Sequence, residues 1–325
     1  MPHDHHSHAH HGHDHTHDHH AHDHRHYMHA VNWQDAGATR RAFVIGAILN
    51  IGFVIIEYLA GWWTDSVALM ADASHNLTDV MGLLMAFVAV RLAARLPSRR
   101  YTYGMGSATI LAALGNGLLL VFISGALTVE SIDRLFNPAP VATLPVVITA
   151  LIGAAINFGT ATLFHGHSHN DVNTRGVYIH MLGDAGVSVA VAVGAIAMRY
   201  TGLSWIDPFL GLVIVAVILL STWKLLRESI DLALQGVPKN VDALAVKDFL
   251  TSQPGVGVVH DMHIWALSTT ETALTAHLVM PGGHPGDSFI EQVTTELANR
   301  FQIVHTTVQI ETTPHQAGCG ISDSV

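Results

Sequence analysis

The sequence predicts a polytopic α-helical membrane protein with six transmembrane helices, both termini in the cytosol, and a small C-terminal α+β domain folded as an open-faced sandwich. Half of the 325 residues are hydrophobic and only 12% are charged, whereas soluble domains carry about 25% charged residues. Six apolar stretches each approach the ~20 residues that cross a bilayer as a helix. Beyond about residue 236 the pattern changes to short amphipathic helices and alternating strands.

The first segment, 1–38, is predicted to be a disordered, His-rich cytosolic tail. Of the first 30 residues, 15 are His, alternating mainly with Asp, Ser, Ala and Gly. This polar composition differs from that of a signal peptide, which needs an apolar run. An expression tag is the alternative interpretation, but such a tag is normally an unbroken His run. The interleaved pattern therefore favours a native segment.

The transmembrane domain is predicted over 39–236. Gly and other small residues recur within the apolar stretches, as suits close helix packing in lipid. Lys and Arg are concentrated before the first span and after the second, fourth and sixth spans. The three loops on the opposite side hold only Arg134 and Arg199. By the positive-inside rule, both termini then lie in the cytosol. The predicted spans are roughly 42–63, 68–92, 107–130, 144–165, 176–200 and 205–223.

A cytosolic domain is predicted over 237–314, after the helix breakers Gly236 and Pro238. Asn240 is the expected N-cap of its first helix. The order α-β-β-α-β describes a sheet with helices on one face. The expected elements are a helix over 241–252, strands over 256–267 and 272–280, a helix over 287–300 and a strand over 303–311.

The charge and the cysteine content exclude two classes of protein. The formal net charge is −10, whereas a nucleic-acid binder shows a basic face or stripe; no nucleic-acid partner is expected. The single cysteine, Cys319, cannot form an intramolecular disulfide framework. It lies in the last segment, 315–325, which is predicted to be a flexible tail.

Two matching motifs lie inside predicted spans. The second span contains His75 and Asp79, and the fifth contains His180 and Asp184, each pair in the pattern His-x-x-x-Asp. Side chains at i and i+4 lie on one face of a helix, one turn apart. An Asp at the bilayer centre costs about 2.5–3.5 kcal/mol on insertion scales, so packing alone is a poor explanation for a repeated pair. The sequence therefore predicts an intramembrane metal site.

Two imidazoles and two carboxylates suit Zn²⁺, which takes four tetrahedral N, O or S ligands. The two carboxylates also balance the charge of a dication within the bilayer. The same donors accept Cd²⁺, Co²⁺ and Ni²⁺ to some degree, so a broader exporter of these ions stays open as an alternative. When the metal leaves, the clustered groups are expected to take up protons, because proton and metal compete for the same ligand atoms. This predicts metal/proton antiport.

Two further carboxylates lie in the predicted spans. Asp72 precedes His75 by three residues on the same side of the helix. Either it orients that imidazole from behind the ligand set, or it is a residue at the water interface. Glu57, deep in the first span, is either a proton relay or a structural hydrogen-bonding group.

The chain resembles the cation diffusion facilitators, in particular their zinc-type branch of cobalt–zinc–cadmium exporters and zinc transporters. The resemblance spans about residues 40–312. It is carried by the segment Ser66–Asp79, the motif around His180 and Asp184, the segment Tyr101–Gly104 and the segment His260–Trp265. It implies a homodimer, alternating access, a metallochaperone-like cytosolic domain and transport of the ion by His75, Asp79, His180 and Asp184.

The resemblance also implies a cytosolic regulatory zinc site at His260, His277 and Glu311; solvated strand-end residues are the alternative. The sequence departs from the family at Ser107 and Thr109, where members usually carry Arg and Glu. The loop 96–106 lacks His, Asp, Glu and Cys, so no zinc site is expected there. His165, His167 and His169, together with the tail, are interpreted as a metal-collecting antenna, with solvated low-complexity sequence as the alternative.

Two rivals from other classes are a membrane metalloenzyme and a metal sensor. A zinc peptidase needs a His-Glu pair, which the sequence lacks, and a catalytic zinc keeps an open position. A sensor with a simple anchor would not need ligands inside the bilayer. The sequence therefore predicts a transporter rather than an enzyme. Its expected partners are Zn²⁺ and related cations, protons and lipid, and its expected location is a bacterial inner membrane.

Overall fold

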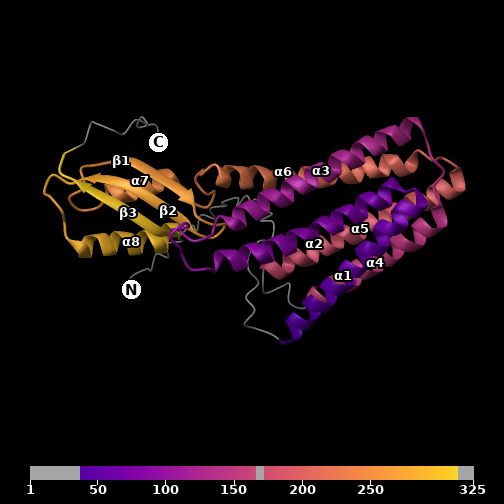
Figure 1. The fold of residues 1–325 in the computed structure, drawn as a ribbon, viewed down its shortest axis with the longest axis horizontal. Coiled ribbons are helices and arrows are strands. Elements are labelled where there is room, and N and C mark those ends of the chain that lie inside the picture. The colour runs from indigo at the N-terminus through magenta and orange to yellow at the C-terminus, as the bar shows by residue number, and fades with distance from the viewer. Residues whose placement is uncertain (1–36, 166–171, 314–325) are drawn as a thin grey trace, which may run out of the picture.

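The computed structural model describes residues 37–165 and 172–313, and within them six long helices precede a small domain of helices and strands. The long helices run lengthwise beside one another, and the small domain lies at one end of them (Figure 1). The helices are α1 (Gly37–Thr64), α2 (Val67–Ala93), α3 (Ala108–Phe136), α4 (Thr143–His165), α5 (Val172–Thr201) and α6 (Ile206–Ala233).

The predicted class is confirmed. In the described part of the chain, α2 to α6 are long and apolar enough to cross a membrane, by length and composition, and α1 contains the remaining apolar stretch. The helices are longer than the predicted spans, most clearly α6, which continues from about residue 223 to Ala233. Their connections place the α1–α2, α3–α4 and α5–α6 turns at the end of the bundle away from the small domain (Figure 1). We call this end the distal end.

The core of the bundle lies near the distal end. It combines the first turns of α2, such as Val67 and Leu69, with residues of α3, α4, α5 and α6, such as Leu127 and Ile214. Toward the small domain α1 points away from α2 (Figure 1), whereas α3 stays against α2, since a side chain at Gly82 would meet that of Asn116. The largest apolar core of the bundle therefore lies at its distal end.

A buried carboxylate fixes the start of α2. Asp207, at the start of α6, accepts hydrogen bonds from the Ser66 hydroxyl (2.5 Å) and from the backbone N–H of Val67 (2.6 Å). Ser66 is itself the N-cap of α2 and accepts from the N–H of Leu69. The first backbone donors of a helix have no partner within the helix, so Asp207 satisfies them from a neighbouring helix. It thereby ties α2 to α6.

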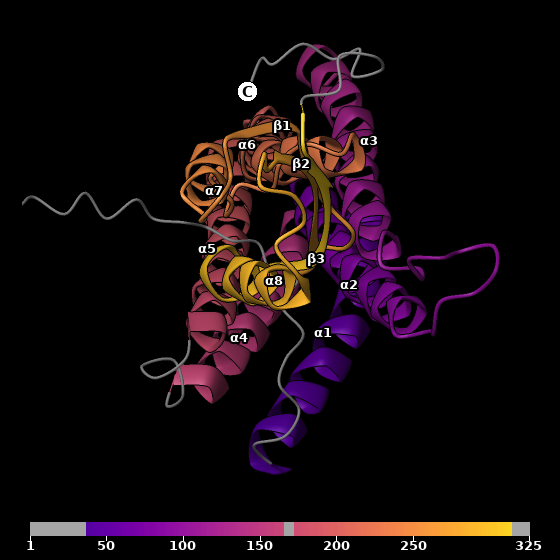
Figure 2. The ribbon, with the colours of Figure 1, turned by 90° about the vertical axis from the view of Figure 1, so that its left-hand side faces the viewer.

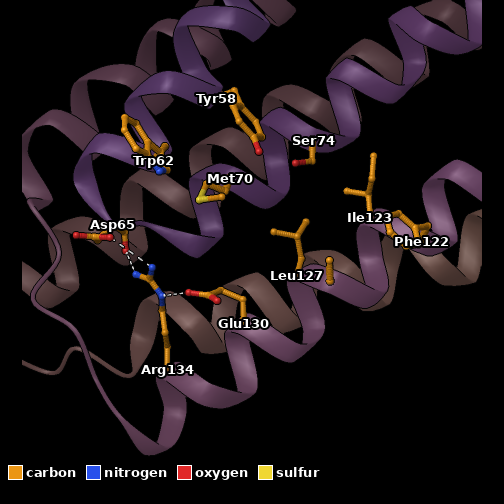
Figure 3. A pocket seen from close by; sticks show the side chains of 11 residues that line it. Tyr58, Trp62, Asp65, Met70, Ser74, Phe122, Ile123, Leu127, Glu130 and Arg134 are labelled. Carbon is orange, nitrogen blue, oxygen red and sulfur yellow. Dashed lines mark hydrogen bonds and ion pairs between the residues drawn. The ribbon is translucent and has the colours of Figure 1, made fainter.

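A second tie at the distal end involves Arg134 of α3. Its guanidinium donates to the carboxylate of Glu130 (2.7 Å) and to the backbone carbonyl of Asp65 in the α1–α2 turn. These three residues close one side of a pocket between α1, α2 and α3 that is otherwise lined mainly by apolar side chains (Figure 3). Arg134, one of the two basic residues of the predicted outer loops, thus serves as a helix-end bridge.

The small domain follows the predicted order α-β-β-α-β. Its elements are α7 (Ala243–Thr251), β1 (Val258–Ala266), β2 (Thr272–Val279), α8 (Asp287–Phe301) and β3 (Ile303–Glu311). The strands form one sheet in the order β1-β2-β3, with β1 antiparallel and β3 parallel to β2. One detail of the prediction is wrong. Asp242, not Asn240, caps α7, because its carboxylate accepts from the N–H groups of Leu244 and Ala245.

The two faces of this sheet differ in chemistry. One face packs on α7 and α8 and forms the domain core with them. In this core, Leu274 and Leu278 of β2 and Leu297 of α8 are fully buried. The other face, which we call the open face, carries polar side chains because side chains alternate along a strand. The end-on view shows α7 and α8 on the same side of the strands (Figure 2). The predicted open-faced sandwich is confirmed.

The loop between β1 and β2 contacts the start of α3. The Ser107 hydroxyl donates to the carbonyl of Leu267 (3.3 Å), and the Thr109 hydroxyl accepts from the N–H of Thr269 (3.0 Å). A side chain at Gly106 would bring its Cβ within 2.8 Å of the Leu267 carbonyl oxygen. Nearby, the ring of Tyr103 meets that of His305 edge-on. The two positions that depart from the family resemblance therefore form a neutral hydrogen-bonded joint between bundle and sheet.

Candidate metal centres

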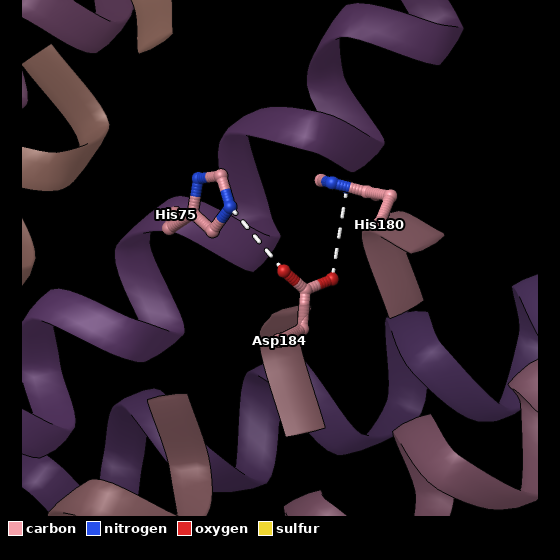
Figure 4. Close-up of side chains that lie close together, drawn as sticks. All are labelled: His75, His180 and Asp184. Atoms are coloured by element: carbon pink, nitrogen blue, oxygen red, sulfur yellow. Dashed lines mark ion pairs between the residues drawn. The ribbon is translucent and has the colours of Figure 1, made fainter. Parts of the chain in front are cut away.

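The first candidate centre lies between α2 and α5, where the four predicted residues meet. His75 Nε2 is 3.6 Å from Asp79 Oδ2 and 3.5 Å from Asp184 Oδ1. His180 Nε2 is 2.9 Å from Asp79 Oδ2 and 3.6 Å from Asp184 Oδ2. Figure 4 shows both imidazoles turned toward the carboxylate of Asp184. Each carboxylate thus faces both imidazoles.

These distances fit one tetrahedral ion. With metal–ligand bonds of ~2.0–2.1 Å, neighbouring ligand atoms of a tetrahedron lie about 3.3 Å apart. The four His–Asp separations, from 2.9 to 3.6 Å, bracket that value. One ligand atom each from His75, His180 and Asp184 lies within 4.8 Å of the others. Asp79 is not in this group, although its Oδ2 lies within 3.6 Å of both imidazoles.

Two atoms of this cluster are buried without a hydrogen-bond partner among the described residues. They are Nδ1 of His75 and Oδ2 of Asp184. Buried polar atoms of this kind are rare and call for a partner. Asp184 Oδ2 faces His180 at ion-pair distance, so a dication between them would satisfy it. The donor set, with two nitrogens and two carboxylates, suits zinc-class ions better than Mg²⁺ or Ca²⁺.

The four side chains of this centre differ in exposure, and the exposure decreases toward the distal end. His180 and Asp79 are 38% and 31% exposed, whereas His75 and Asp184 are 18% and 5% exposed. Because α2 runs from the distal end and α5 runs toward it, Asp79 and His180 lie on the side nearer the small domain. The centre is therefore accessible from that side and is closed by the packed core on the distal side.

Asp72 and Glu57 lie beside the centre and are fully buried. Asp72 Oδ2 accepts from the hydroxyl of Ser188 on α5 (2.8 Å). Glu57 Oε2 on α1 accepts from the amide of Asn76 (3.3 Å), the residue after His75. These contacts join α2 to α5 and α2 to α1 at the level of the ligands. The hydrogen bond of Glu57 agrees with its structural interpretation.

The second candidate centre lies on the open face of the sheet. His260, His277 and Glu311 each place one ligand atom within 4.8 Å of the others. His260 Nε2 is 3.1 Å from Glu311 Oε2, and His277 Nδ1 is 2.9 Å from Glu311 Oε1. Each residue comes from a different strand, and we call these three the triad. The geometry again matches the spacing of zinc ligands.

Sequence reasoning missed two neighbours of the triad. Asp261 Oδ1 is 3.0 Å from His263 Nε2, and Asp261 Oδ2 is 3.6 Å from His277 Nε2. Simple alternation along a strand places Asp261 and His263 on the opposite face from His260. The strand pairing instead shifts between His260 and His263, and this irregularity was not visible in the sequence. The motif His-Asp-Met-His was the available signal.

Several predicted features lie outside the described residues. They are residues 1–36 of the predicted His-rich segment 1–38, His167 and His169, and the last segment with Cys319; the two remaining residues of the segment begin α1, and His165 ends α4, but its side chain is not described. The loop 96–106, where no zinc site is expected, contributes Gly106 to the joint with the sheet.

Two family matches cover nearly all of the described chain. Residues 43–232 match the family described as the cation efflux transmembrane domain. Residues 238–313 match the family described as the cation efflux protein, cytoplasmic domain. The boundary between the two matches falls between α6 and α7.

Bacterial relatives are similar over most of their length. The metal cation efflux system protein CzcD of Cupriavidus metallidurans is 34% identical over 86% of this chain and 88% of its own. A zinc transporter, ZitB, of Pectobacterium atrosepticum is 35% identical over 85% of this chain and 87% of its own. A cadmium, cobalt and zinc/H⁺-K⁺ antiporter of Bacillus velezensis is 32% identical over 86% and 90%.

Proposed function

Because this chain belongs to the cation efflux family, we propose that it exports Zn²⁺ from the cytosol in exchange for protons. The ion is carried by His75, Asp79, His180 and Asp184. The chain is a multi-pass membrane transporter and not an enzyme, and its bacterial relatives support a bacterial inner membrane as its location.

One observation carries the proposal: two imidazoles and two carboxylates from separate lipid-embedded helices converge with the spacing of a tetrahedral ion. The two carboxylates neutralise a dication, so the loaded centre adds no net charge to the bilayer. Without such pairing, charged groups at this depth are costly. The ion and its ligands thus stabilise one another inside the membrane.

The exposure pattern supports loading from the cytosol. The more exposed pair, Asp79 and His180, lies nearer the small domain, whose matching family is described as a cytoplasmic domain. The distal ends of α2, α3 and α6 are held together by Asp207 and Arg134. Export then requires the distal packing to open while the cytosolic side closes, which is alternating access between two states.

Proton exchange follows from the same ligand set. An ion leaving toward the distal side uncovers two carboxylates and two imidazoles that face one another. Protons replace the ion because ligand atoms bind either a proton or a metal. The empty centre then returns to the cytosolic side with its charge balanced. Asp72, held by Ser188, positions α5 against α2 throughout this exchange.

The triad supports a regulatory zinc site in a homodimer. Its ligand atoms converge as those of the transport centre do. It lies on strands β1, β2 and β3, and the loop between the first two of these strands makes the hydrogen bonds to Ser107 and Thr109 at the start of α3. A second copy of this chain is the proposed partner.

A broader range of cargo is the second candidate function. The names of relatives mention cadmium and cobalt beside zinc, and imidazole–carboxylate sites accept Cd²⁺, Co²⁺ and Ni²⁺. The geometry of the centre does not separate these ions, so transport by this protein is expected to include them.

Reconstitution into vesicles tests the proposal. Purified protein in proteoliposomes is given Zn²⁺ on one side, while Zn²⁺ and internal pH are followed with separate dyes. The wild type is expected to move Zn²⁺ and protons in opposite directions. His75→Ala is expected to lose at least about 100-fold in rate, more than the 10–100-fold typical of losing an outer partner of a ligand.

The matched control is His284→Gln, an exposed histidine in the loop before α8, which is expected to transport like the wild type. Zinc transport that leaves the internal pH unchanged, with no other counter-ion moving, contradicts the antiport. Full activity of His75→Ala contradicts the assignment of the centre.

A further inference from the structure

The side-chain amide of Asn157 on α4 is buried and has no hydrogen-bond partner among the described residues. Asn157 is 1% exposed, and both its Nδ2 and its Oδ1 are unpaired. An amide offers two N–H donors and an acceptor oxygen, and burying such groups without hydrogen bonds costs free energy. Buried polar atoms without partners are rare in folded proteins, so this amide calls for an explanation.

Helix packing brings Asn157 to the level of Asp184. α4 runs away from the distal end and α5 runs toward it, so these two packed helices are antiparallel (Figure 1). At Gly153 an added Cβ would lie 3.4 Å from the hydroxyl oxygen of Ser188. Asn157 follows Gly153 by four residues, and Asp184 precedes Ser188 by four. Side chains four residues apart share a helix face, so one turn beyond this contact Asn157 is level with Asp184.

Helix α1 contributes another unpaired amide oxygen at the same level. α1 runs toward the distal end and is therefore also antiparallel to α4, against which it packs (Figure 1). The added Cβ at Gly153 would lie 2.8 Å from the ring of Phe53. Asn50 precedes Phe53 by three residues, and its buried Oδ1 has no hydrogen-bond partner in the described part of the chain. Unpaired polar atoms of α1, α4 and α5 thus lie together beside the transport centre.

The Asp184 carboxylate can accept a hydrogen bond while it binds an ion. Its Oδ1 faces His75 and its Oδ2 faces His180, and Oδ2 is buried without a hydrogen-bond partner among the described residues. Each carboxylate oxygen has two lone pairs, so one can bind the ion and the other can accept an N–H. Carboxylates that bind metals are commonly held by hydrogen bonds of this kind, which orient them.

We propose that Asn157 is a positioning residue of the transport centre, whose Nδ2 donates to the Asp184 carboxylate as the ion binds. The second hydrogen of Nδ2 is donated to Asn50 Oδ1, so the amide joins α1 to the centre. Asn157 acts through Asp184 and does not bind the ion itself. This inference rests on the proposed ion binding by Asp184, and it adds a residue of α4 to the groups that determine the affinity for the ion.

Zinc binding tests the inference. Full-length protein in detergent is equilibrated across a series of buffered free Zn²⁺ concentrations, and bound zinc per chain is measured by elemental analysis. The binding step that His75→Ala removes is the step of the transport centre. Asn157→Leu replaces the amide by an apolar side chain of similar size. It is expected to move this step to about 10–100-fold higher free Zn²⁺, the usual effect of losing a hydrogen-bond partner of a ligand.

Two further measurements separate positioning from a structural role. In proteoliposomes, Asn157→Leu is expected to raise the half-saturating Zn²⁺ concentration by more than it lowers the maximal rate. Without zinc, its thermal unfolding midpoint in detergent is expected to equal or exceed that of the wild type, because an unpaired buried amide does not stabilise the fold. A lower midpoint of the zinc-free variant would show that the amide has a structural role, and it would overturn the inference.

The control is Ser131→Ala, which also removes a buried polar atom without a partner among the described residues. Ser131 lies at the distal end of α3, beside Gly211, and this variant is expected to bind and transport zinc like the wild type. If Asn157→Leu binds zinc with the same curve as Ser131→Ala, the inference is refuted. If His75→Ala removes no binding step, the assignment of the transport centre fails independently of the result for Asn157→Leu.

Discussion

At the residue scale, the buried carboxylates of the bundle differ in the groups that they contact. Asp79 and Asp184 each contact both imidazoles, so the charge of the ion is balanced symmetrically from two helices. The neighbouring carboxylates have different partners, with Asp72 bound to Ser188 and Glu57 bound to Asn76. Two of these carboxylates thus face both imidazoles, and the other two make hydrogen bonds between helices.

The balance of nitrogen and oxygen ligands is expected to set metal selectivity. His180→Asp replaces one imidazole by a third carboxylate, which favours harder cations such as Mn²⁺ over Zn²⁺. The measurement is uptake of Zn²⁺, Cd²⁺, Co²⁺ and Mn²⁺ into inverted vesicles, wild type beside variant. We expect the ratio of Zn²⁺ to Mn²⁺ rates to fall by about tenfold or more, since ligand softness orders the affinities of these ions. An unchanged ratio contradicts the assignment of His180 as a ligand.

At the scale of elements, helix ends are joined by polar contacts while helix bodies pack through apolar ones. Asp207 caps α2 from α6, and Arg134 links α3 to the α1–α2 turn. At the other end, Ser107 and Thr109 hold the β1–β2 loop against α3. These ties set which parts of the molecule move together when the two sides of the centre open in turn.

Loss of the Asp207 cap is expected to destabilise the distal end. Asp207→Asn removes the charge that accepts the Ser66 hydroxyl and the Val67 N–H, and a hydrogen bond to a charged group contributes about 1.5–3 kcal/mol. We therefore expect a lower thermal unfolding midpoint in detergent. Asp133→Asn is the control, because among the described residues the exposed Asp133 carboxylate accepts a side-chain hydrogen bond from Asn137, one helical turn away. Equal midpoints for both variants would refute the capping role.

The joint between bundle and sheet is expected to depend on close contact at Gly106. Gly106→Ala places a Cβ 2.8 Å from the Leu267 carbonyl oxygen, and forced contacts of this kind cost about 1–3 kcal/mol. Gly125→Ala, where no atom lies within 4 Å of the added Cβ, is the matched control. We expect only Gly106→Ala to increase proteolytic cleavage between the bundle and the small domain. Equal cleavage of the two variants would show that the contact does not hold the domains together.

At the scale of the whole molecule, one chain carries ligand sets in two environments. The transport centre lies within the bundle, and the triad lies on the exposed face of a sheet outside it. The His-rich tail adds a third set of weak ligands by composition.

Deletion of residues 2–29 is expected to weaken transport at low metal concentration and to leave the maximal rate similar. Weak, exchangeable histidine ligands raise the local ion concentration without taking part in the transport step. The measurement is the initial rate of Zn²⁺ transport against Zn²⁺ concentration in proteoliposomes. Abolished transport at saturating Zn²⁺ would contradict a collecting role.

The sequence by itself determined the class of the protein and predicted the four residues proposed as ligands of its transport centre. Apolar stretches long enough to span a bilayer can only be helices there, because lipid offers no partners for backbone groups. The repeated His-x-x-x-Asp spacing places each pair on one helix face, whereas alternation in the C-terminal part predicts strands. These patterns involve residues that are close together in the sequence, so they can be recognised without knowledge of the fold.

Tertiary structure alone decided the long-range partners. Asp207 reaches Ser66 across 141 positions of the chain, and no local pattern predicts which helix end a distant carboxylate caps. The bulge at Asp261 reversed the face on which His263 lies, because one inserted residue shifts every side chain beyond it to the other side of a strand. Periodicity predicts the faces of an element, but the pairing of elements decides which faces meet.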